Sequence, residues 1–262
     1  MTFKLLNVSN FLFSLFSICN LTMTQNVSES INVGGTNISS NFSVQGANPL
    51  IICLKAKAEL PVALIENYLN QYKDVRVESE GDISFSGLIY KTTKKSPSLT
   101  LTSKNSGLIS FVDGSKMYSS KDKLNINVIT EGSIVFSSKS LIQTNSGNIR
   151  LKVFKVSQNV PAITNSISLQ GTLYASSHTK GGIIVIESDN IKLEAQSKIL
   201  AKGELGGGAI LIGGDWQGRA SKEYRVFKNP KAVYQATNVN MAQGASNIQA
   251  SPETALITGY IL

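Results

Sequence analysis

The fold is indicated by a short stretch, Gly81-Asp-Ile-Ser-Phe-Ser86, which returns twice at a nearly constant interval. It recurs as Gly107-Leu-Ile-Ser-Phe-Val112 and as Gly132-Ser-Ile-Val-Phe-Ser137, so the glycines stand 26 and then 25 residues apart. A fixed period of this length is the signature of a repeat architecture. The series continues, after one longer gap, at Ile167-Ser-Leu169, Ile191-Lys-Leu193 and Val239-Asn-Met241.

Two further series of apolar residues recur along the chain with about the same period as the first. The second consists of residue pairs: Val75/Val77, Leu99/Leu101, Leu124/Ile126, Ile149/Leu151, Ile184/Ile186 and Ile210/Ile212. The third consists of single residues: Ile89, Met117, Ile142, Leu173, Ile199 and Ile248. All three series share the same long gap, which predicts an extra loop at about residues 155–164.

Two apolar residues separated by one residue are typical of a strand with one buried face. Three short strands in every 25 residues or so predict an all-β fold, a right-handed parallel β-helix (β-solenoid). Equivalent residues should then stack one interstrand distance apart, at ~5 Å. We therefore expect Ile83, Ile109, Ile134, Ile167 and Ile191 to form one inward ladder. A Greek-key sandwich does not predict such recurrence.

One segment departs from strand periodicity. Leu60, Leu64, Ile65, Tyr68 and Leu69 follow helical spacing after an early proline, and they predict one short helix over residues 62–71. The chain then divides into an N-terminal segment with irregular or partial coils (1–58), the helix and its connection (59–74), β-helix coils (75–218), and a loop excursion with a truncated last coil (219–262).

The N-terminal segment carries an apolar run over residues 4–21, with the length of a signal-peptide core. It is either a secretion signal or a buried strand of the first coil. Cys19 and Cys53, the only cysteines, would pair if the chain is exported; otherwise they are small buried hydrophobic residues.

Composition narrows the range of functions. The 262 residues carry a net charge of +8 but only one histidine and two cysteines, which excludes a Cys/His zinc site and most histidine-dependent catalysis. The lysines are scattered and do not alternate with aromatic residues, so we expect no nucleic-acid partner. A basic surface instead favours attraction to anionic polymers of cell surfaces.

Several stretches together resemble the repeats of filamentous-haemagglutinin-like proteins, the exoproteins of bacterial two-partner secretion. They include residues 64–83, 123–149 and 190–208, and the most specific is Ile210-Leu-Ile-Gly-Gly-Asp-Trp-Gln-Gly218 followed by Tyr234-Gln-Ala-Thr237. The resemblance covers about residues 60 to 250 and implies a β-helical, adhesive protein that is secreted or held at a bacterial surface. It also implies an outer-membrane transporter as the partner in export.

The chain departs from this family in two respects. Such exoproteins are far longer, and their secretion domain carries an Asn-Pro signature that is only faintly echoed by Asn48-Pro49-Leu50. We therefore expect a piece of a longer exoprotein, and we expect the open ends of its coils to allow self-association.

Few side chains are candidates for catalysis or ligand binding. Glu78, Glu80 and Asp82 alternate on one strand face, where a calcium site or acid–base pair would need them, but Thr102, Lys104 and Ser106 occupy the equivalent positions one coil on. A solvated edge is therefore expected. Glu187 and Asp189 are predicted to be turn residues, and His178 a surface residue. Asp215 is predicted to lie in a tight turn, with Trp216 covering the edge of the coil; alternatively, carbohydrate stacks on the indole of Trp216.

These patterns predict no catalytic, cofactor-binding or metal-binding residue. The expected function is a non-catalytic structural and adhesive segment whose partners are cell-surface glycans or proteins. Two alternatives stay open: a polysaccharide-active β-helix lyase or hydrolase, and an eroded fragment without activity.

Overall fold

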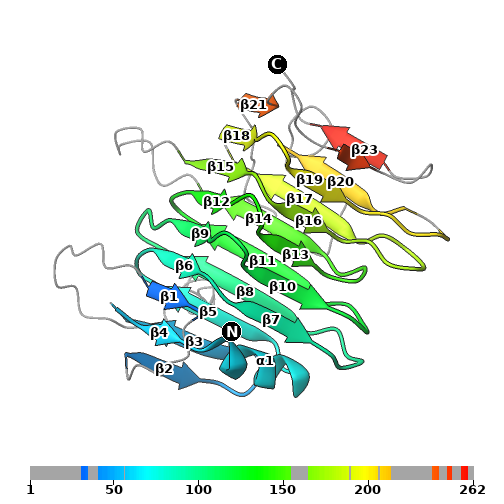
Figure 1. Ribbon diagram of the computed structural model, residues 1–262. Helices are drawn as coiled ribbons and strands as arrows, with labels where there is room; N and C mark the ends of the chain where they lie inside the picture. The colour runs from blue at the N-terminus through cyan, green and yellow to red at the C-terminus, as the bar shows by residue number, and fades with distance from the viewer. Residues whose placement is uncertain are drawn as a thin grey trace, which may run out of the picture.

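The computed structural model describes residues 31–34, 41–55, 57–154, 165–188, 190–205 and 207–213, together with the backbone of three strands at 238–241, 247–249 and 255–258. The chain winds through three sheets in turn and forms a β-solenoid with one short helix (Figure 1). All strand pairs are parallel except that between β2 and β3. The predicted all-β, parallel β-helix is confirmed.

Each sheet collects the same strand of successive coils. Sheet A contains β1 (Ile31–Val33), β4 (Glu59–Leu60), β6 (Ile83–Phe85), β9 (Ile109–Phe111), β12 (Ile134–Phe136), β15 (Ser166–Leu169), β18 (Asn190–Leu193) and β21 (Asn238–Met241). Sheet C contains β7 (Leu88–Lys91), β10 (Lys116–Ser119), β13 (Leu141–Gln143), β16 (Thr172–Tyr174), β19 (Lys198–Leu200) and β22 (Asn247–Gln249). Sheet B contains β2 (Phe42–Gln45), β3 (Leu50–Leu54), β5 (Val75–Ser79), β8 (Ser98–Ser103), β11 (Asn125–Thr130), β14 (Ile149–Val153), β17 (Ile183–Glu187), β20 (Ala209–Ile212) and β23 (Ala255–Thr258).

The first and third series of the sequence coincide with the register of sheets A and C. Ile83, Ile109, Ile134, Ile167 and Ile191 pair in that order, and Val239 pairs next with Ile191. In sheet C the pairing runs from Ile89 through Met117, Ile142, Leu173 and Ile199 to Ile248. The predicted inward ladder is therefore confirmed.

The second series is wrong at one coil. Leu99 and Leu101 pair with Ile126 and Val128, and not with Leu124 and Ile126 as predicted. Leu124 is buried in the corner that precedes β11. A slip of two residues keeps the same side chains on the inner face, so alternation alone cannot distinguish the two registers.

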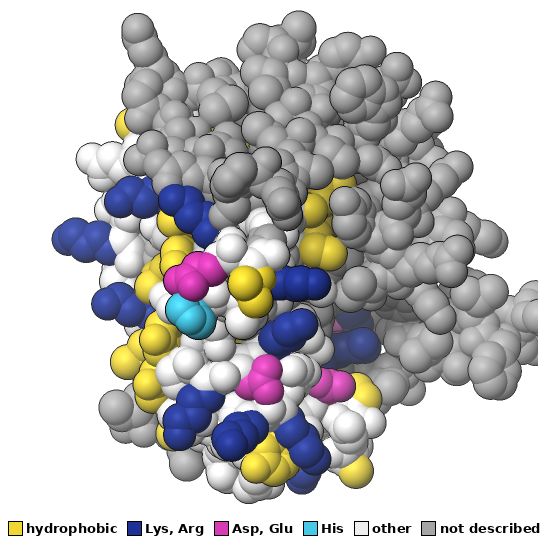
Figure 2. Space-filling model, turned by 90° about the vertical axis from the view of Figure 1, so that its right-hand side faces the viewer, with side chains coloured by type: hydrophobic (Ala, Val, Ile, Leu, Met, Phe, Trp, Pro, Cys, Tyr) yellow, Lys and Arg dark blue, Asp and Glu magenta, His cyan; other side chains and the backbone are white. Residues whose placement is uncertain are grey.

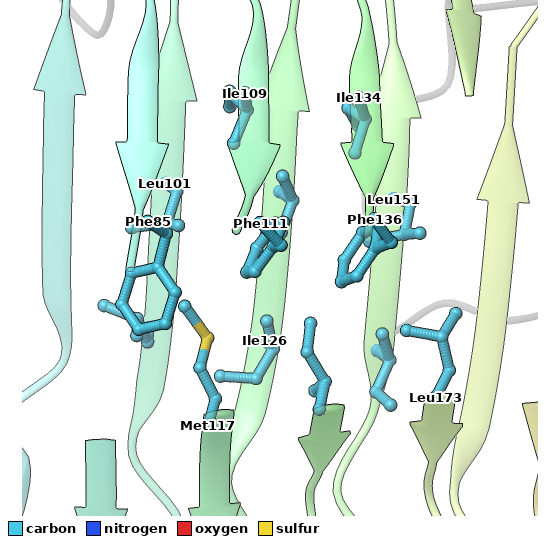
Figure 3. Close-up of a cluster of buried hydrophobic side chains, with 14 of the residues drawn as sticks. Phe85, Leu101, Ile109, Phe111, Met117, Ile126, Ile134, Phe136, Leu151 and Leu173 are labelled. Carbon is cyan, nitrogen blue, oxygen red and sulfur yellow. The ribbon is translucent and has the colours of Figure 1, made fainter. Parts of the chain in front are cut away.

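The core is a stack of aliphatic and aromatic side chains in the interior of the coils. Phe85, Phe111 and Phe136 occupy equivalent positions, with ring centroids 5.5 Å apart for the first pair and 4.0 Å for the second (Figure 3). All three rings are fully buried. Because a coil cannot cover its own inner face, each layer depends on the layers above and below it.

The helix α1 (Val62–Asn70) matches the predicted helix to within one residue. Pro61 precedes it with φ −65° and ψ 132°, and Ile65 and Leu69 are its buried face. Its polar side chains reach the first strand of sheet C: Glu66 Oε1 accepts the Tyr90 N–H at 2.6 Å and Asn70 Oδ1 accepts the Thr92 N–H at 3.0 Å. The helix thus covers the edge of sheet C at the N-terminal side of the stack (Figure 1).

Strands on both sides of residues 75–218 join the same three sheets. On the N-terminal side, β3 pairs with β5 in sheet B, while β1 lies between β4 and β6 in sheet A. All five residues of β3 are buried, which hides the alternation that identifies the other strands. On the C-terminal side, β21, β22 and β23 add one strand to each sheet, and β21 and β22 contain the predicted series members Val239 and Ile248.

Candidate binding surface

The acidic triplet lies at the junction of sheet B and the corner that follows it. Glu78 is on β5 with its carboxylate 3.5 Å from Arg76 and 3.8 Å from Lys104. Glu80 lies 3.6 Å from the same lysine. Asp82 Oδ1 accepts the N–H of Leu108, one coil on, at 2.7 Å. These carboxylates are engaged with basic side chains or with backbone, rather than with a common ligand position.

Other acidic and amide side chains form a second kind of coil-to-coil contact. Asp74 Oδ1 accepts the N–H of Ser98 at 2.7 Å, and Asn148 Oδ1 accepts the N–H of Ile183 at 3.1 Å. Asp113 accepts the N–H of Lys139 at 3.0 Å, and this hydrogen bond is the main reason why the pKa of Asp113 is lowered. Carboxylate and amide oxygens at the corners thus accept hydrogen bonds from backbone N–H groups where a strand begins or the chain turns.

Glu187 was predicted as a turn residue, but it is the last residue of strand β17 and is buried. Its carboxylate is buried 2.7 Å from Arg150 and 3.5 Å from Lys152, which lie on the preceding strand of sheet B. Desolvation lowers the pKa of Lys152, and the charge of Glu187 partly opposes that shift. This cluster could not be recognised in the sequence, because Glu187 follows Arg150 by 37 residues and only the fold brings it beside Arg150 and Lys152. Asp189 lies outside the described residues.

His178 is at the surface, as predicted. It is 85% exposed, and its Nδ1 lies 2.9 Å from Glu204 Oε1. Figure 2 shows this histidine beside an acidic side chain, among dispersed lysine and arginine side chains. Asp215, Trp216 (the predicted turn and possible carbohydrate-stacking site) and Cys19 lie outside the described residues.

Cys53 corrects one expectation. It is disulfide-bonded, so it is not a free buried thiol.

The described residues contain neither a metal-binding group nor a membrane-spanning helix. Within them, no group of three or more histidine, cysteine, aspartate or glutamate side chains is arranged to hold a metal ion. In that same part of the chain, no helix has the length and apolar character needed to cross a membrane.

The outer face of sheet C carries the surface feature that most clearly points to a ligand. Tyr90 and Tyr118 are in register on adjacent coils, and their rings stack with centroids 5.1 Å apart and planes 5° apart. Gln143 follows on the next coil and Tyr174 on the one after. Tyr90 is 42% exposed, although the apolar ring of tyrosine is commonly packed against other residues. No other described strand places an aromatic ring on its outward side, since Phe42 of β2 packs against the core.

Lysines accompany this tyrosine ladder. Lys116 and Lys198 are exposed in a parallel outward ladder, separated by Leu141 and Thr172. The corners that lead from sheet C to sheet B add Lys94, Lys95, Lys121, Lys123, Lys180 and Lys202. Figure 2, which views the edge with His178, shows basic side chains next to hydrophobic ones.

Sequence reasoning overlooked this face although the signal was present. Each tyrosine directly follows an apolar residue of the third series, as in Ile89-Tyr90, Met117-Tyr118 and Leu173-Tyr174. In a strand, the residue after an inward one points outward, so the recurrence placed the rings on one face.

The chain was compared with family models, curated proteins and solved structures, and nothing matches it.

Proposed function

We propose that the chain is a non-catalytic structural and adhesive β-solenoid segment of a secreted or cell-surface protein. The observation that carries the proposal is the outer face of sheet C, where tyrosines and lysines are displayed on a stack of coils. Multivalent display of this kind suits contact with polymers or other cells better than enclosure of a small substrate. Cell-surface glycans or proteins are the partners that such a face would contact.

The carboxylates singled out as candidates support a non-catalytic role. Catalysis of glycoside cleavage requires two carboxyl groups roughly 5 to 9.5 Å apart on either side of a bond. Glu78 and Glu80 are both paired with Lys104, and Asp82 accepts a backbone N–H. Glu187 is buried between two basic side chains.

The disulfide at Cys53 supports export, because thiols are kept reduced in most cytosols. The resemblance to filamentous-haemagglutinin-like repeats supports a bacterial surface or secreted location, with export of the longer product through an outer-membrane transporter.

Adhesion and catalysis are separated by two measurements on the purified chain. Fluorescently labelled chain should bind intact cells in flow cytometry, and binding should fall when cell-surface glycans or proteins are removed enzymatically. The chain length of acidic polysaccharides incubated with it and calcium should stay constant by size-exclusion chromatography. Shortening of the polymer, or absence of cell binding, contradicts the proposal.

A further inference from the structure

The outward positions of strands β7 to β19 in sheet C have a distinctive charge pattern. They hold three tyrosines and two lysines, and none of them is a carboxylate. The adjoining corners hold the acidic side chains Asp113, Asp122, Glu194 and Glu204. Each is already engaged: Asp113 pairs with Lys139 and Glu194 with Lys192, Asp122 accepts the N–H of Lys123, and Glu204 contacts His178. The face and its lysine-bearing edge are therefore positively charged.

The spacing of this face is set by the coils. Strands in register lie ~4.8 Å apart, so Lys116 and Lys198, which are three coil steps from one another, are separated by roughly 14 Å. A monosaccharide unit in an extended polysaccharide advances by a length comparable to one coil. A linear glycan that runs along the solenoid axis would thus present about one sugar to each coil.

We infer that the outer face of sheet C binds an extended acidic polysaccharide along the solenoid axis. The apolar faces of the sugar rings contact the tyrosine ladder of Tyr90, Tyr118 and Tyr174, and the anionic groups pair with Lys116, Lys198 and the lysines of the neighbouring corner. Amphipathic rings and basic side chains are the groups that recognise such a polymer. This inference deepens the proposed adhesive function and rests on it.

Charge argues against a second copy of the chain as the occupant. Face-to-face packing of two sheet C surfaces would place lysines against lysines with no carboxylate on either face. An anionic partner relieves this repulsion.

The test measures binding of polygalacturonate and of dextran sulfate by isothermal titration calorimetry at low and moderate salt. Neutral dextran and single-stranded poly(U) serve as comparison polymers. The wild-type chain should bind both acidic polysaccharides, more weakly at higher salt, and should bind neutral dextran and poly(U) less tightly. Tighter binding of poly(U) or equal binding of neutral dextran overturns the inference.

Variants locate the site. The double variant Lys116→Gln/Lys198→Gln should bind the acidic polysaccharides roughly fivefold to tenfold more weakly and with a reduced salt dependence. Tyr118→Ala should weaken binding several-fold. Lys192→Gln is the matched control, because Lys192 is an outward lysine of a strand in sheet A and is 57% exposed. Far-ultraviolet circular dichroism of each variant verifies that the coils are intact.

Two outcomes overturn the inference: unchanged affinity in the double lysine variant, or an equal loss in Lys192→Gln. Cell binding and polysaccharide cleavage test the adhesive function independently of the site on sheet C. Cell binding that persists in the lysine and tyrosine variants leaves adhesion standing but removes it from sheet C. Cleavage of the bound polysaccharide contradicts the adhesive function whatever the variants do.

Discussion

Gly81 and Gly132 occupy equivalent corners in the sequence repeat, but their surroundings differ. A Cβ placed on Gly132 would lie 2.2 Å from the backbone oxygen of Ser106 and 2.5 Å from that of Gly107. A Cβ on Gly81 would meet nothing within 4 Å. The first coil of the repeat has an open corner, whereas the corner of Gly132 is packed against the coil before it.

We therefore expect Gly132→Ala to lower the free energy of unfolding by about 1–3 kcal/mol or more, because backbone must shift to admit the methyl group. Gly81→Ala is the matched control and should change it by about 0.5 kcal/mol at most. Urea denaturation followed by circular dichroism measures both. Equal effects would show that the corner is not crowded.

Lys91 is a buried cation inside a coil. Its side chain is fully enclosed on the inner side of β7, and its Nζ donates a hydrogen bond to the carbonyl oxygen of Thr93 at 2.7 Å. Desolvation lowers the pKa of Lys91 below the ordinary 10.5, and the charge of Asp122 opposes the shift in part. Folding thus disfavours the protonated form of this amine.

The sign of the pH effect follows from that shift. Between the lowered pKa of the folded state and 10.5, the unfolded chain binds more protons at this site, so wild-type stability should rise with pH through this window. Lys91→Met should be more stable than wild type at neutral pH, by about 1 kcal/mol, with the difference shrinking toward pH 10. Thermal melts across this pH range test the trend, with the exposed Lys94→Met as control. A difference that does not vary with pH contradicts the argument.

At the scale of elements, helix α1 protects an edge strand. The Glu66 and Asn70 side chains accept hydrogen bonds from the backbone N–H groups of Tyr90 and Thr92, and no described strand precedes β7 in sheet C to pair with them. An open strand edge is a site for unwanted pairing, and covering it is one of the ways in which proteins avoid aggregation.

Glu66→Ala/Asn70→Ala should therefore accelerate amide hydrogen exchange at Tyr90 and Thr92 and reduce stability by about 1 kcal/mol for each lost hydrogen bond. Exchange is followed by nuclear magnetic resonance. Asn67→Ala is the control, since Asn67 bonds only within the described helix turn, to Gln71. Exchange at both amides that stays at the wild-type rate would show that the helix does not protect this edge.

At the scale of the whole molecule, stability is shared between neighbouring coils. Phe111 stacks on Phe136 in one direction and contacts Phe85 in the other, so it belongs to two interfaces at once. In a solenoid, a defect in one layer weakens its neighbours because the coils are coupled in a line.

Phe111→Ala should lower the free energy of unfolding by about 3–5 kcal/mol. Hydrogen exchange should rise in the coils on both sides of the substitution, and not only in its own coil. Val112→Ala, at the adjacent position with 40% exposure, should leave both quantities close to wild type. Exchange confined to the mutated coil would contradict coupling between layers.

The repeat could be read from sequence because its chemistry is local. Inward residues such as Ile83 and Ile109 alternate with polar ones, and glycine precedes them at a constant period. Each coil meets the same physical requirement, a buried inner face and a turn at each corner, so the fold class, the inward ladders of sheets A and C and the helix near residues 62–71 were predictable. The tyrosine ladder followed the same alternation and could have been found in the same way.

The remaining features depend on how coils of unequal length are brought together. Alternation is unchanged by a slip of two residues, so only packing selects Ile126 over Leu124 as the partner of Leu99. The pairing of Glu187 with Arg150 and Lys152 spans a longer coil, and the crowding at Gly132 depends on the path of the preceding corner. The sequence by itself determined the architecture, through a pattern repeated in every coil. The tertiary structure decided the register and the surroundings of individual charges and glycines, because these arise from contacts between coils whose separation along the chain is variable.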